Sequence, residues 1–358
     1  MVKNHIISGR YTNDGTSLVP LNDLQKKYIF EFRNDKRFEY KTVEQCVLCG
    51  GTEFILIAEK DRYGIPVDTA VCDRCGLIFS LTQMTDESAK IFYSEYYRKI
   101  YEGVEVPPIQ YYKSYLGKRG IPRFLNHFST VVEIGTGGGW NLLKYKLKNI
   151  KHYGFDYDEN YIAFGKNKFG LNLFNGGVKK AKELGVKADY VILCHVLEHT
   201  MNPVEFLSEI QDIMQDNAIL DVTVPSASLL LMGGAGTGYD LLGTLQNAHI
   251  YLFDRFVLQY IALKSGYDFY ITLGETIVLK KNKNSSTRLL KIENILKKNP
   301  RGKKVIKYLK LCEMLVPFKN KIIPSKLKSG LHYIEYFYRP YELLKSYFLF
   351  RKGLIRNG

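Results

Sequence analysis

The sequence predicts an α/β protein in which a doubly wound, mostly parallel sheet follows a small cysteine-bearing module and precedes a basic, mainly helical extension. Three observations predict this fold. Short apolar strands alternate with amphipathic helices from about residue 110 to 281. Two Cys-x-x-Cys pairs precede that region, and positive charge gathers behind it. With 358 residues, of which 46% are hydrophobic, the chain can bury one large core and a smaller module.

Composition and periodicity divide the chain into five parts. These are a leader segment (1–40), the cysteine-bearing module (41–84), a helical connector (85–128), the main α/β domain (129–281) and a basic, aromatic extension (282–358). The connector begins with a helix over 85–103, which Thr85 or Asp86 caps and Gly103 ends.

The module holds four of the six cysteines, as Cys46-x-x-Cys49 and Cys72-x-x-Cys75 with 22 residues between the pairs. A glycine follows each pair, so the backbone can turn tightly around the sulfurs. Four thiolates suit a tetrahedral zinc ion, and we predict one structural Zn²⁺ per chain in a zinc ribbon. Because protein ligands would fill all four positions, this metal has no catalytic role. Four unrelated buried cysteines, or a redox pair, are the alternatives.

The main domain opens with a strand and a glycine turn, "VVEIGTGGG" (131–139). Glycines are needed where a ligand lies against the main chain and a helix N-terminus. Asp156 follows at the expected end of the second strand, where a carboxylate can accept both ribose hydroxyls of a nucleoside.

Glu133-x-Gly135-x-Gly137-x-Gly139 resembles the first motif of the class I S-adenosylmethionine-dependent methyltransferases. The later runs 188–210, 221–226 and 247–269 resemble, in order, the fourth strand with its His-x-Leu-Glu-His segment, the fifth strand, and the histidine-containing turn with the final helix of that family. The resemblance implies a Rossmann-like methyltransferase sheet that binds S-adenosylmethionine. A nicotinamide enzyme, or a fold kept for binding alone, remains an alternative.

The resemblance also implies the cofactor-binding residues. These are Glu133, Gly135, Gly137, Gly139 and Asp156, with main-chain adenine contacts near Gly177 and Val178, because no acidic residue follows the third strand.

A base is needed if the methyl acceptor is a hydroxyl or an activated carbon acid. His249 ranks first, because its loop follows the fifth strand and a glycine-rich segment (233–239) that could close over substrate, and because imidazole titrates near neutrality. His195, at the exit of the fourth strand, ranks second. Substrate binding and structural hydrogen bonding are the other interpretations of both residues.

The order of cysteine module, connector helix and methyltransferase core is similar to zinc-ribbon methyltransferases of bacterial sugar and surface-glycan biosynthesis. That resemblance implies methyl transfer to a saccharide or related metabolite, such as a nucleotide sugar or lipid-linked glycan. An RNA or DNA methyltransferase, or a zinc-dependent nucleic-acid-binding protein, is the alternative.

Charge is concentrated at the end of the chain. Residues 280–358 hold 21 Lys or Arg and four Glu, a net charge of +17, while the rest carries −2. This extension predicts peripheral contact with the inner membrane surface, nucleic-acid binding, or a solvated helical segment. Few cysteines, and no apolar run of signal-peptide or transmembrane length, predict a cytoplasmic protein.

Overall fold

The computed structural model describes residues 2–109, 111–112, 128–225, 240–273, 276–282 and 286–316. Its strands are β1 (Val2–Asn4), β2 (Tyr40–Thr42), β3 (Phe54–Lys60), β4 (Pro66–Cys72), β5 (Ile78–Ser80), β6 (Thr82–Met84), β7 (Thr130–Ile134), β8 (Lys151–Asp156), β9 (Leu173–Asn175), β10 (Ala188–Cys194), β11 (Met214–Thr223), β12 (Tyr251–Leu252), β13 (Tyr267–Leu273) and β14 (Thr276–Lys281).

The principal helices are α1 (Asp23–Asn34), α2 (Asp86–Ile91), α3 (Tyr97–Tyr101), α5 (Leu143–Lys146), α6 (Glu159–Phe169), α7 (Val178–Glu183), α8 (Pro203–Ile210), α10 (Arg255–Lys264), α11 (Ser286–Lys298) and α12 (Gly302–Leu315). Short 3₁₀ turns are η1 (Gly9–Tyr11), η4 (Leu197–His199), η5 (Gln211–Ile213) and η6 (Leu242–Thr244), and η2 (Phe92–Tyr96) is a π-helical turn. The glycine-rich segment 233–239 and the extension beyond residue 316 lie outside the described residues.

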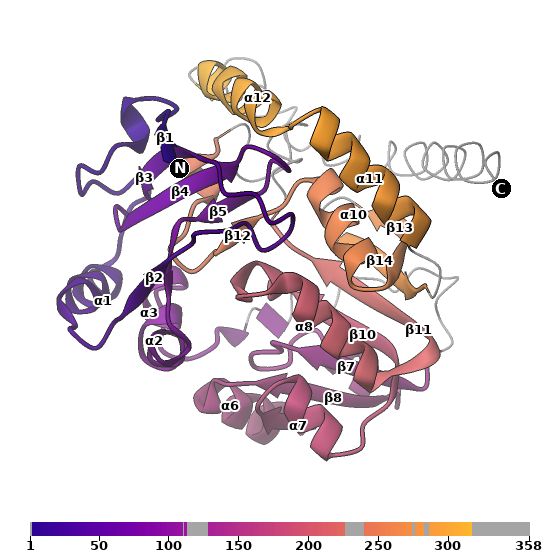
Figure 1. The fold of residues 1–358 in the computed structure, drawn as a ribbon. Helices are drawn as coiled ribbons and strands as arrows, with labels where there is room; N and C mark the ends of the chain where they lie inside the picture. Colours follow the sequence, from indigo (N-terminus) through magenta and orange to yellow (C-terminus); the bar gives the residue numbers. More distant parts are fainter. Residues whose placement is uncertain are drawn as a thin grey trace, which may run out of the picture.

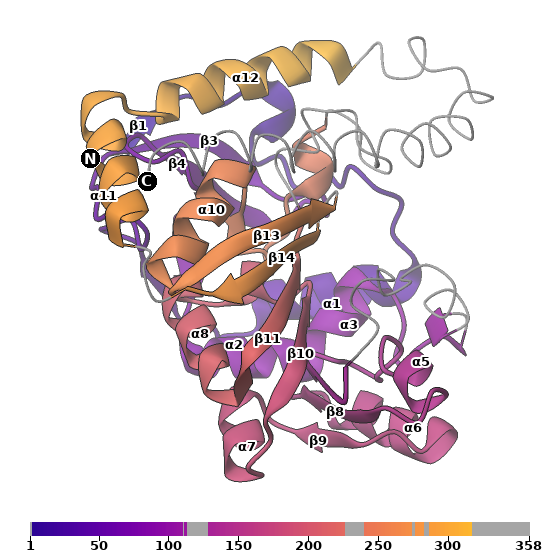
Figure 2. The same cartoon turned by 90° about the vertical axis from the view of Figure 1, so that its right-hand side faces the viewer.

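Seven described strands form the main sheet, in the order β13-β14-β11-β10-β7-β8-β9 (Figure 1). Strands β9, β8, β7, β10 and β11 run parallel, and β14 is antiparallel to both of its neighbours. Figure 2 shows α8 and α10 on one side of this sheet and α5 and α6 on the other. The predicted doubly wound, Rossmann-like sheet is confirmed, and the chain reverses its strand order between β7 and β10, where such sheets bind ligands.

A second sheet, in the order β1-β3-β4-β5-β12, joins three parts of the chain. Strands β3 and β4 belong to the cysteine-bearing module. The leader adds β1, parallel to β3, and the main domain adds β12, antiparallel to β5 with Tyr251 opposite Phe79. The sheet therefore crosses the sequence boundaries expected at residues 40 and 84.

The predicted connector helix is present, but it is built from three segments, α2, the π-helical turn η2 and α3. Thr85 caps it, because its side chain accepts a hydrogen bond of 3.3 Å from the Ser88 amide. Gly103 ends it at φ +65°. π-Helical turns within helices often occur at functional sites, since they displace side chains around the axis.

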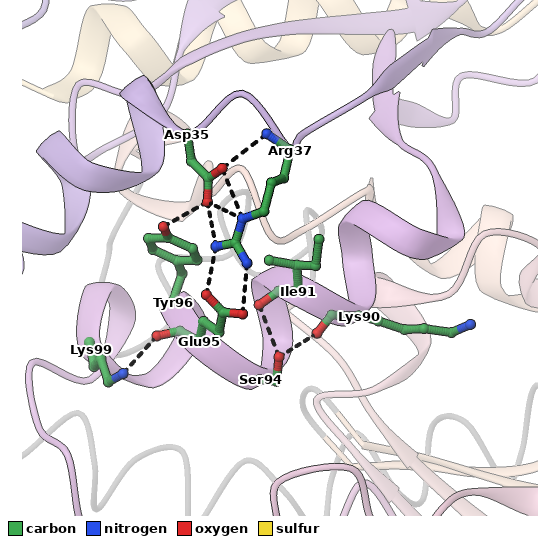
Figure 3. Close-up of polar contacts among 8 residues, drawn as sticks. All are labelled: Asp35, Arg37, Lys90, Ile91, Ser94, Glu95, Tyr96 and Lys99. Carbon is green, nitrogen blue, oxygen red and sulfur yellow. Dashed lines mark hydrogen bonds and ion pairs between the residues drawn. The ribbon is translucent and has the colours of Figure 1, made fainter.

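The leader fixes that π-helical turn through a charged network (Figure 3). Arg37 donates to both oxygens of Glu95 at 3.0 and 2.7 Å and to Asp35 at 2.6 Å. Asp35 also accepts a hydrogen bond of 2.9 Å from the Tyr96 hydroxyl. Asp35 and Arg37, which follow α1, thus bind one face of the turn. The opposite face remains available to line the cleft, as Tyr93 does.

One continuous apolar cluster runs through both sheets. It joins Phe54 and Cys72 of the module to Val132 and Phe155 of the main sheet and to Val257 of α10, each at most 2% exposed. Because interior packing is as dense as in a crystal, the module and the main domain cannot shift independently without opening voids.

Candidate active site and cysteine cluster

A cavity of about 880 Å³ lies at the carboxyl ends of β7, β8 and β10. The connector helix lines it opposite the sheet, and the loop after β3 and the 243–249 loop contribute further wall. Five carboxylates line this cleft but only three Lys or Arg side chains do. The cleft is therefore suited to a ligand that carries positive charge.

The glycine turn forms one wall. Gly135, Gly137 and Gly139 have φ of +69°, +55° and +78°, a region that side chains other than glycine rarely adopt. Glu133 braces the turn, since its two oxygens accept hydrogen bonds from Thr136 Oγ1 (2.8 Å) and Asn141 Nδ2 (2.6 Å). Glu133 lines the cleft but is only 1% exposed.

A fourth glycine supports this wall and was not singled out from the sequence. A Cβ on Gly165 of α6 would lie 2.2 Å from the Gly138 carbonyl oxygen. Only glycine therefore lets α6 approach the turn this closely. Its backbone has ordinary helical geometry, so no turn signal marks it in the sequence.

Asp156 lies at the end of β8, as predicted, and lines the cleft. Its oxygens accept hydrogen bonds from the amides of Gly137 (2.6 Å) and Asp158 (2.9 Å). Gly177 and Val178, at the start of α7, line the same cavity. Five of the seven expected cofactor-binding positions therefore line the cavity. The other two, Gly137 and Gly139, lie behind the lining and allow the shape of the turn.

The connector helix places Tyr93, Tyr97 and Arg98 in the cleft wall. Arg98 is paired with Glu102, lies 3.7 Å from Asp158 and sits over the Tyr161 ring at 4.4 Å. A Cβ on Gly137 would come within 3.3 Å of its guanidinium. A guanidinium held by two carboxylates therefore lies beside the glycine turn.

His195 has left-handed backbone geometry, with φ +56°. Its Nδ1 lies 3.3 Å from Glu198 Oε1, and its side chain is 43% exposed toward the cleft that it lines. Glu198 is fully buried. Backbone strain of this kind costs about 1–3 kcal/mol and gathers at functional sites. The pair has the arrangement of a base held by a carboxylate, in which Glu198 orients the imidazole.

Two more histidines surround Glu198. His199 Nδ1 lies 2.7 Å from the Ala248 carbonyl oxygen, and its Nε2 lies 3.9 Å from Glu198 Oε1. The rings of His199 and His249 are 5.0 Å apart. Burial would raise the pKa of Glu198, but the hydrogen bond to His195 and the charges of the neighbouring histidines lower that pKa overall.

The expectation that His249 titrates near neutrality is wrong. Burial, with the nearby His199, lowers the pKa of His249 to about 3. Its Nδ1 is buried and has no hydrogen-bond partner among the described residues. A base with so low a pKa is neutral at physiological pH but weak, because proton transfer to it is unfavourable.

Glu198, His199 and His249 each offer a metal-ligand atom within 4.8 Å of the others. The set could hold a cation, and Glu198 Oε2, which has no hydrogen-bond partner among the described residues, fits such a use. Glu198 Oε1, however, is already directed at His195. The shorter contact favours a histidine and carboxylate pair over a metal centre.

The module supports the loop that carries His249. Asp61 accepts a hydrogen bond of 3.0 Å from the Asn247 amide, and the Ser80 amide donates to the Ile250 carbonyl at 2.8 Å. Arg62 reaches the cleft wall itself. Sequence reasoning missed Arg62 and Glu198, although Glu198 lies inside the His-x-x-Glu-His segment that could have marked it.

The four cysteines of the module gather away from the cleft. Cys46 and Cys75 have their sulfurs 3.7 Å apart, and the sulfurs of Cys49 and Cys72 are 3.5 Å apart. All four lie within 4.8 Å of one another, and none forms a disulfide. None of them lines the cavity.

Comparison with known proteins agrees with this geometry. Residues 109–270, less than half of the chain, match the family model described as a methyltransferase domain. No curated protein matches the sequence.

Several solved structures are similar in part. An O-methyltransferase family protein from Burkholderia thailandensis is 12% identical, with 48% of this chain and 56% of that chain covered and a TM-score of 0.36. An S-adenosylmethionine-dependent methyltransferase from Archaeoglobus fulgidus is 20% identical, with 49% and 82% covered and a TM-score of 0.34. An O-methyltransferase of neocarzinostatin biosynthesis, in complex with S-adenosylmethionine and a naphthoic acid, is 17% identical, with 43% and 49% covered and a TM-score of 0.35. The chain spans about half the length of the first structures it matches, and none of them identifies its acceptor.

Replacing Asp156 tests the cofactor wall. Asp156→Ala removes the carboxylate that faces the expected ribose site, and each charge-assisted hydrogen bond contributes about 1.5–3 kcal/mol. We expect at least tenfold weaker binding of S-adenosylmethionine by calorimetry. Asp216→Ala, which removes an exposed carboxylate near the start of β11, at the end of the sheet opposite the cleft, is the control and should bind normally. Equal affinity of the two variants, both folded, would show that the ribose site is elsewhere.

Proposed function

We propose that this chain is an S-adenosylmethionine-dependent methyltransferase that methylates a hydroxyl-bearing small molecule, a saccharide or related metabolite of sugar or surface-glycan biosynthesis. The observation that carries the proposal is the His195–Glu198 pair at the floor of the cleft. S-Adenosylmethionine supplies an electrophilic methyl group on a cationic sulfonium. A hydroxyl acceptor additionally needs a base, and this pair can provide one.

The residues have separate roles in this proposal. Asp156 and the glycine turn would bind the nucleoside end of the cofactor, and Arg98, beside that turn, would attract the carboxylate of its amino-acid end. His195 Nε2 takes the acceptor proton, while Glu198 keeps the ring oriented through Nδ1. Holding the acceptor oxygen in line with the methyl group accounts for much of the rate.

The lining of the cleft supports a polar acceptor of modest size. Tyr93, Tyr97 and Tyr101 combine aromatic faces with hydroxyl groups, and Arg62 adds a donor opposite the sheet. The acidic surplus of the lining argues against the alternative of an RNA or DNA acceptor, because phosphates would be repelled there.

Product analysis of matched variants tests this function. We expect the parent protein, incubated with S-adenosylmethionine and extracts of nucleotide sugars and lipid-linked saccharides, to yield a saccharide heavier by one methyl group. His195→Gln should bind S-adenosylmethionine normally but lose turnover by about 10²–10⁴-fold, the usual contribution of a general base. His249→Gln should lose less.

The opposite ranking, with His249→Gln inactive and His195→Gln near normal, would make His249 the base. Methylated nucleic acid as the sole product would overturn the saccharide proposal, whichever histidine matters.

We also propose that the cysteine cluster binds one structural zinc ion. Sulfurs about 2.3 Å from a tetrahedral zinc lie about 3.8 Å from one another. The separations of 3.7 Å for Cys46 and Cys75 and 3.5 Å for Cys49 and Cys72 fit that geometry. The surrounding chain holds these turns, since Arg301 donates to the Cys75 carbonyl at 3.0 Å. The bound ion would stabilise the module by cross-linking both turns.

Removing one ligand tests the zinc site. We expect elemental analysis of the reduced protein to find one zinc per chain, and Cys72→Ser to lose most of it. Unfolding of that variant should begin at a lower temperature, because structural zinc contributes on the order of 10–16 kcal/mol of apparent binding free energy. Cys312→Ser changes a buried cysteine outside the cluster and should keep its zinc. A metal-free parent protein would refute the site.

A further inference from the structure

The described part of the extension forms two helices along the outside of the molecule. α11 packs against α10, and α12 packs against β4. Both views place α12 at the top edge, with α11 leading to it (Figures 1 and 2). No helix within the described ranges has both the length and the apolar character needed to cross a bilayer.

The arginines and glutamates of these helices face the body of the protein. Arg288 pairs with Asp268 and Arg301 with Asp254, each at 2.8 Å. Glu313 accepts hydrogen bonds from Arg10 and Tyr11 at 3.1 Å. Glu293 accepts one from the Tyr260 hydroxyl at 3.3 Å. Both acidic side chains in 286–316, Glu293 and Glu313, therefore contact the body of the protein.

The outward side carries only positive charge together with large apolar side chains. Its exposed lysines are Lys291, Lys297, Lys298, Lys303, Lys304 and Lys307. None of the six forms an ion pair with an acidic side chain of the described residues. Among them stand Leu290, Ile295, Leu311 and Met314, which are 59%, 53%, 52% and 70% exposed. We call these ten residues the basic face.

We propose that the basic face binds the surface of an anionic lipid bilayer. Lysines attract acidic headgroups, and exposed leucine, isoleucine and methionine side chains can enter the boundary between headgroups and acyl chains. Nucleic acid would account for the lysines but not for four apolar side chains that are more than half exposed. The segregation of arginines inward and lysines outward also shows that the charge is not spread uniformly over these helices.

The sequence beyond residue 316 has the same character. Residues 317–358 hold nine Lys or Arg against two Glu, with Phe, Tyr, Leu and Ile interleaved. The remainder of the chain therefore has the same mixture of basic and apolar residue types as the basic face. A single lysine near an anionic surface contributes only a small part of the binding free energy, so a stable contact needs several such groups together.

Vesicle flotation with the full chain tests the proposal. We expect binding to vesicles of equal parts phosphatidylcholine and phosphatidylglycerol, and little binding to phosphatidylcholine alone. The triple variant Lys303→Gln, Lys304→Gln, Lys307→Gln should bind about 100-fold more weakly, at about fivefold per lysine. The pair Leu311→Ser, Met314→Ser should weaken the binding that remains at high salt, since salt screens charge but not apolar burial.

Lys36→Gln, Lys148→Gln, Lys168→Gln is the matched control, because it removes the same charge from exposed lysines elsewhere. It should bind like the parent protein. If both triple variants lost vesicle binding equally, net charge alone would explain the binding. That result would overturn the assignment to this face. Tighter binding of an RNA oligonucleotide than of anionic vesicles, abolished by the α12 substitutions, would overturn the lipid assignment in favour of nucleic acid.

Discussion

The pairing of β12 with β5 is the contact on which the cleft depends. The two residues of β12, Tyr251 and Leu252, come from the main domain and complete the sheet of the cysteine module. The 243–249 loop that precedes them therefore cannot leave the cleft unless that sheet opens. Asp61 reinforces the joint, since its carboxylate accepts hydrogen bonds from the amides of Tyr63 (2.8 Å), Ile65 (2.9 Å) and Asn247 (3.0 Å). Burial raises the pKa of Asp61 to about 6. Burying this carboxylate costs free energy, but removing it would leave the three amides that donate to it without their acceptor, which would cost more.

The joint places two walls with different residues on opposite sides of the cleft. The main sheet presents the glycine turn and Asp156, which suit a nucleoside, while the module and connector present Arg62, Tyr93 and Arg98 from the opposite side. Methyl transfer needs donor and acceptor held in line, and the joint between the walls fixes the position of one wall relative to the other. The four cysteines lie in the module that forms the second wall and do not line the cavity themselves.

Local signals predicted much of this architecture. Strand alternation, the glycine turn and the paired cysteines each depend on neighbouring residues, so the sheet, the end of β8 at Asp156 and the closeness of the four sulfurs could be anticipated. The joint between β5 and β12 could not, because a two-residue strand has no periodicity of its own. His249 was misjudged because its pKa depends on burial among His199 and Glu198, which tertiary packing alone determines. Glu198 lay within a recognised segment, but its use as a partner for His195 required the left-handed backbone at that histidine.

Kinetics of an Arg62 variant tests the two-walled cleft most directly. Arg62 donates to the Gly243 carbonyl (3.2 Å) and the Tyr63 hydroxyl (2.8 Å), while its Nε is buried without a partner among the described residues. The account predicts that Arg62→Ala raises the KM for the proposed saccharide acceptor at least tenfold, as loss of a hydrogen bond to a charged group would. It also predicts that affinity for S-adenosylmethionine stays unchanged, as it should in Arg74→Ala, which alters an exposed arginine of the same module. An unchanged acceptor KM, or a loss of S-adenosylmethionine affinity without any effect on the acceptor, would contradict the assignment of the second wall to the acceptor.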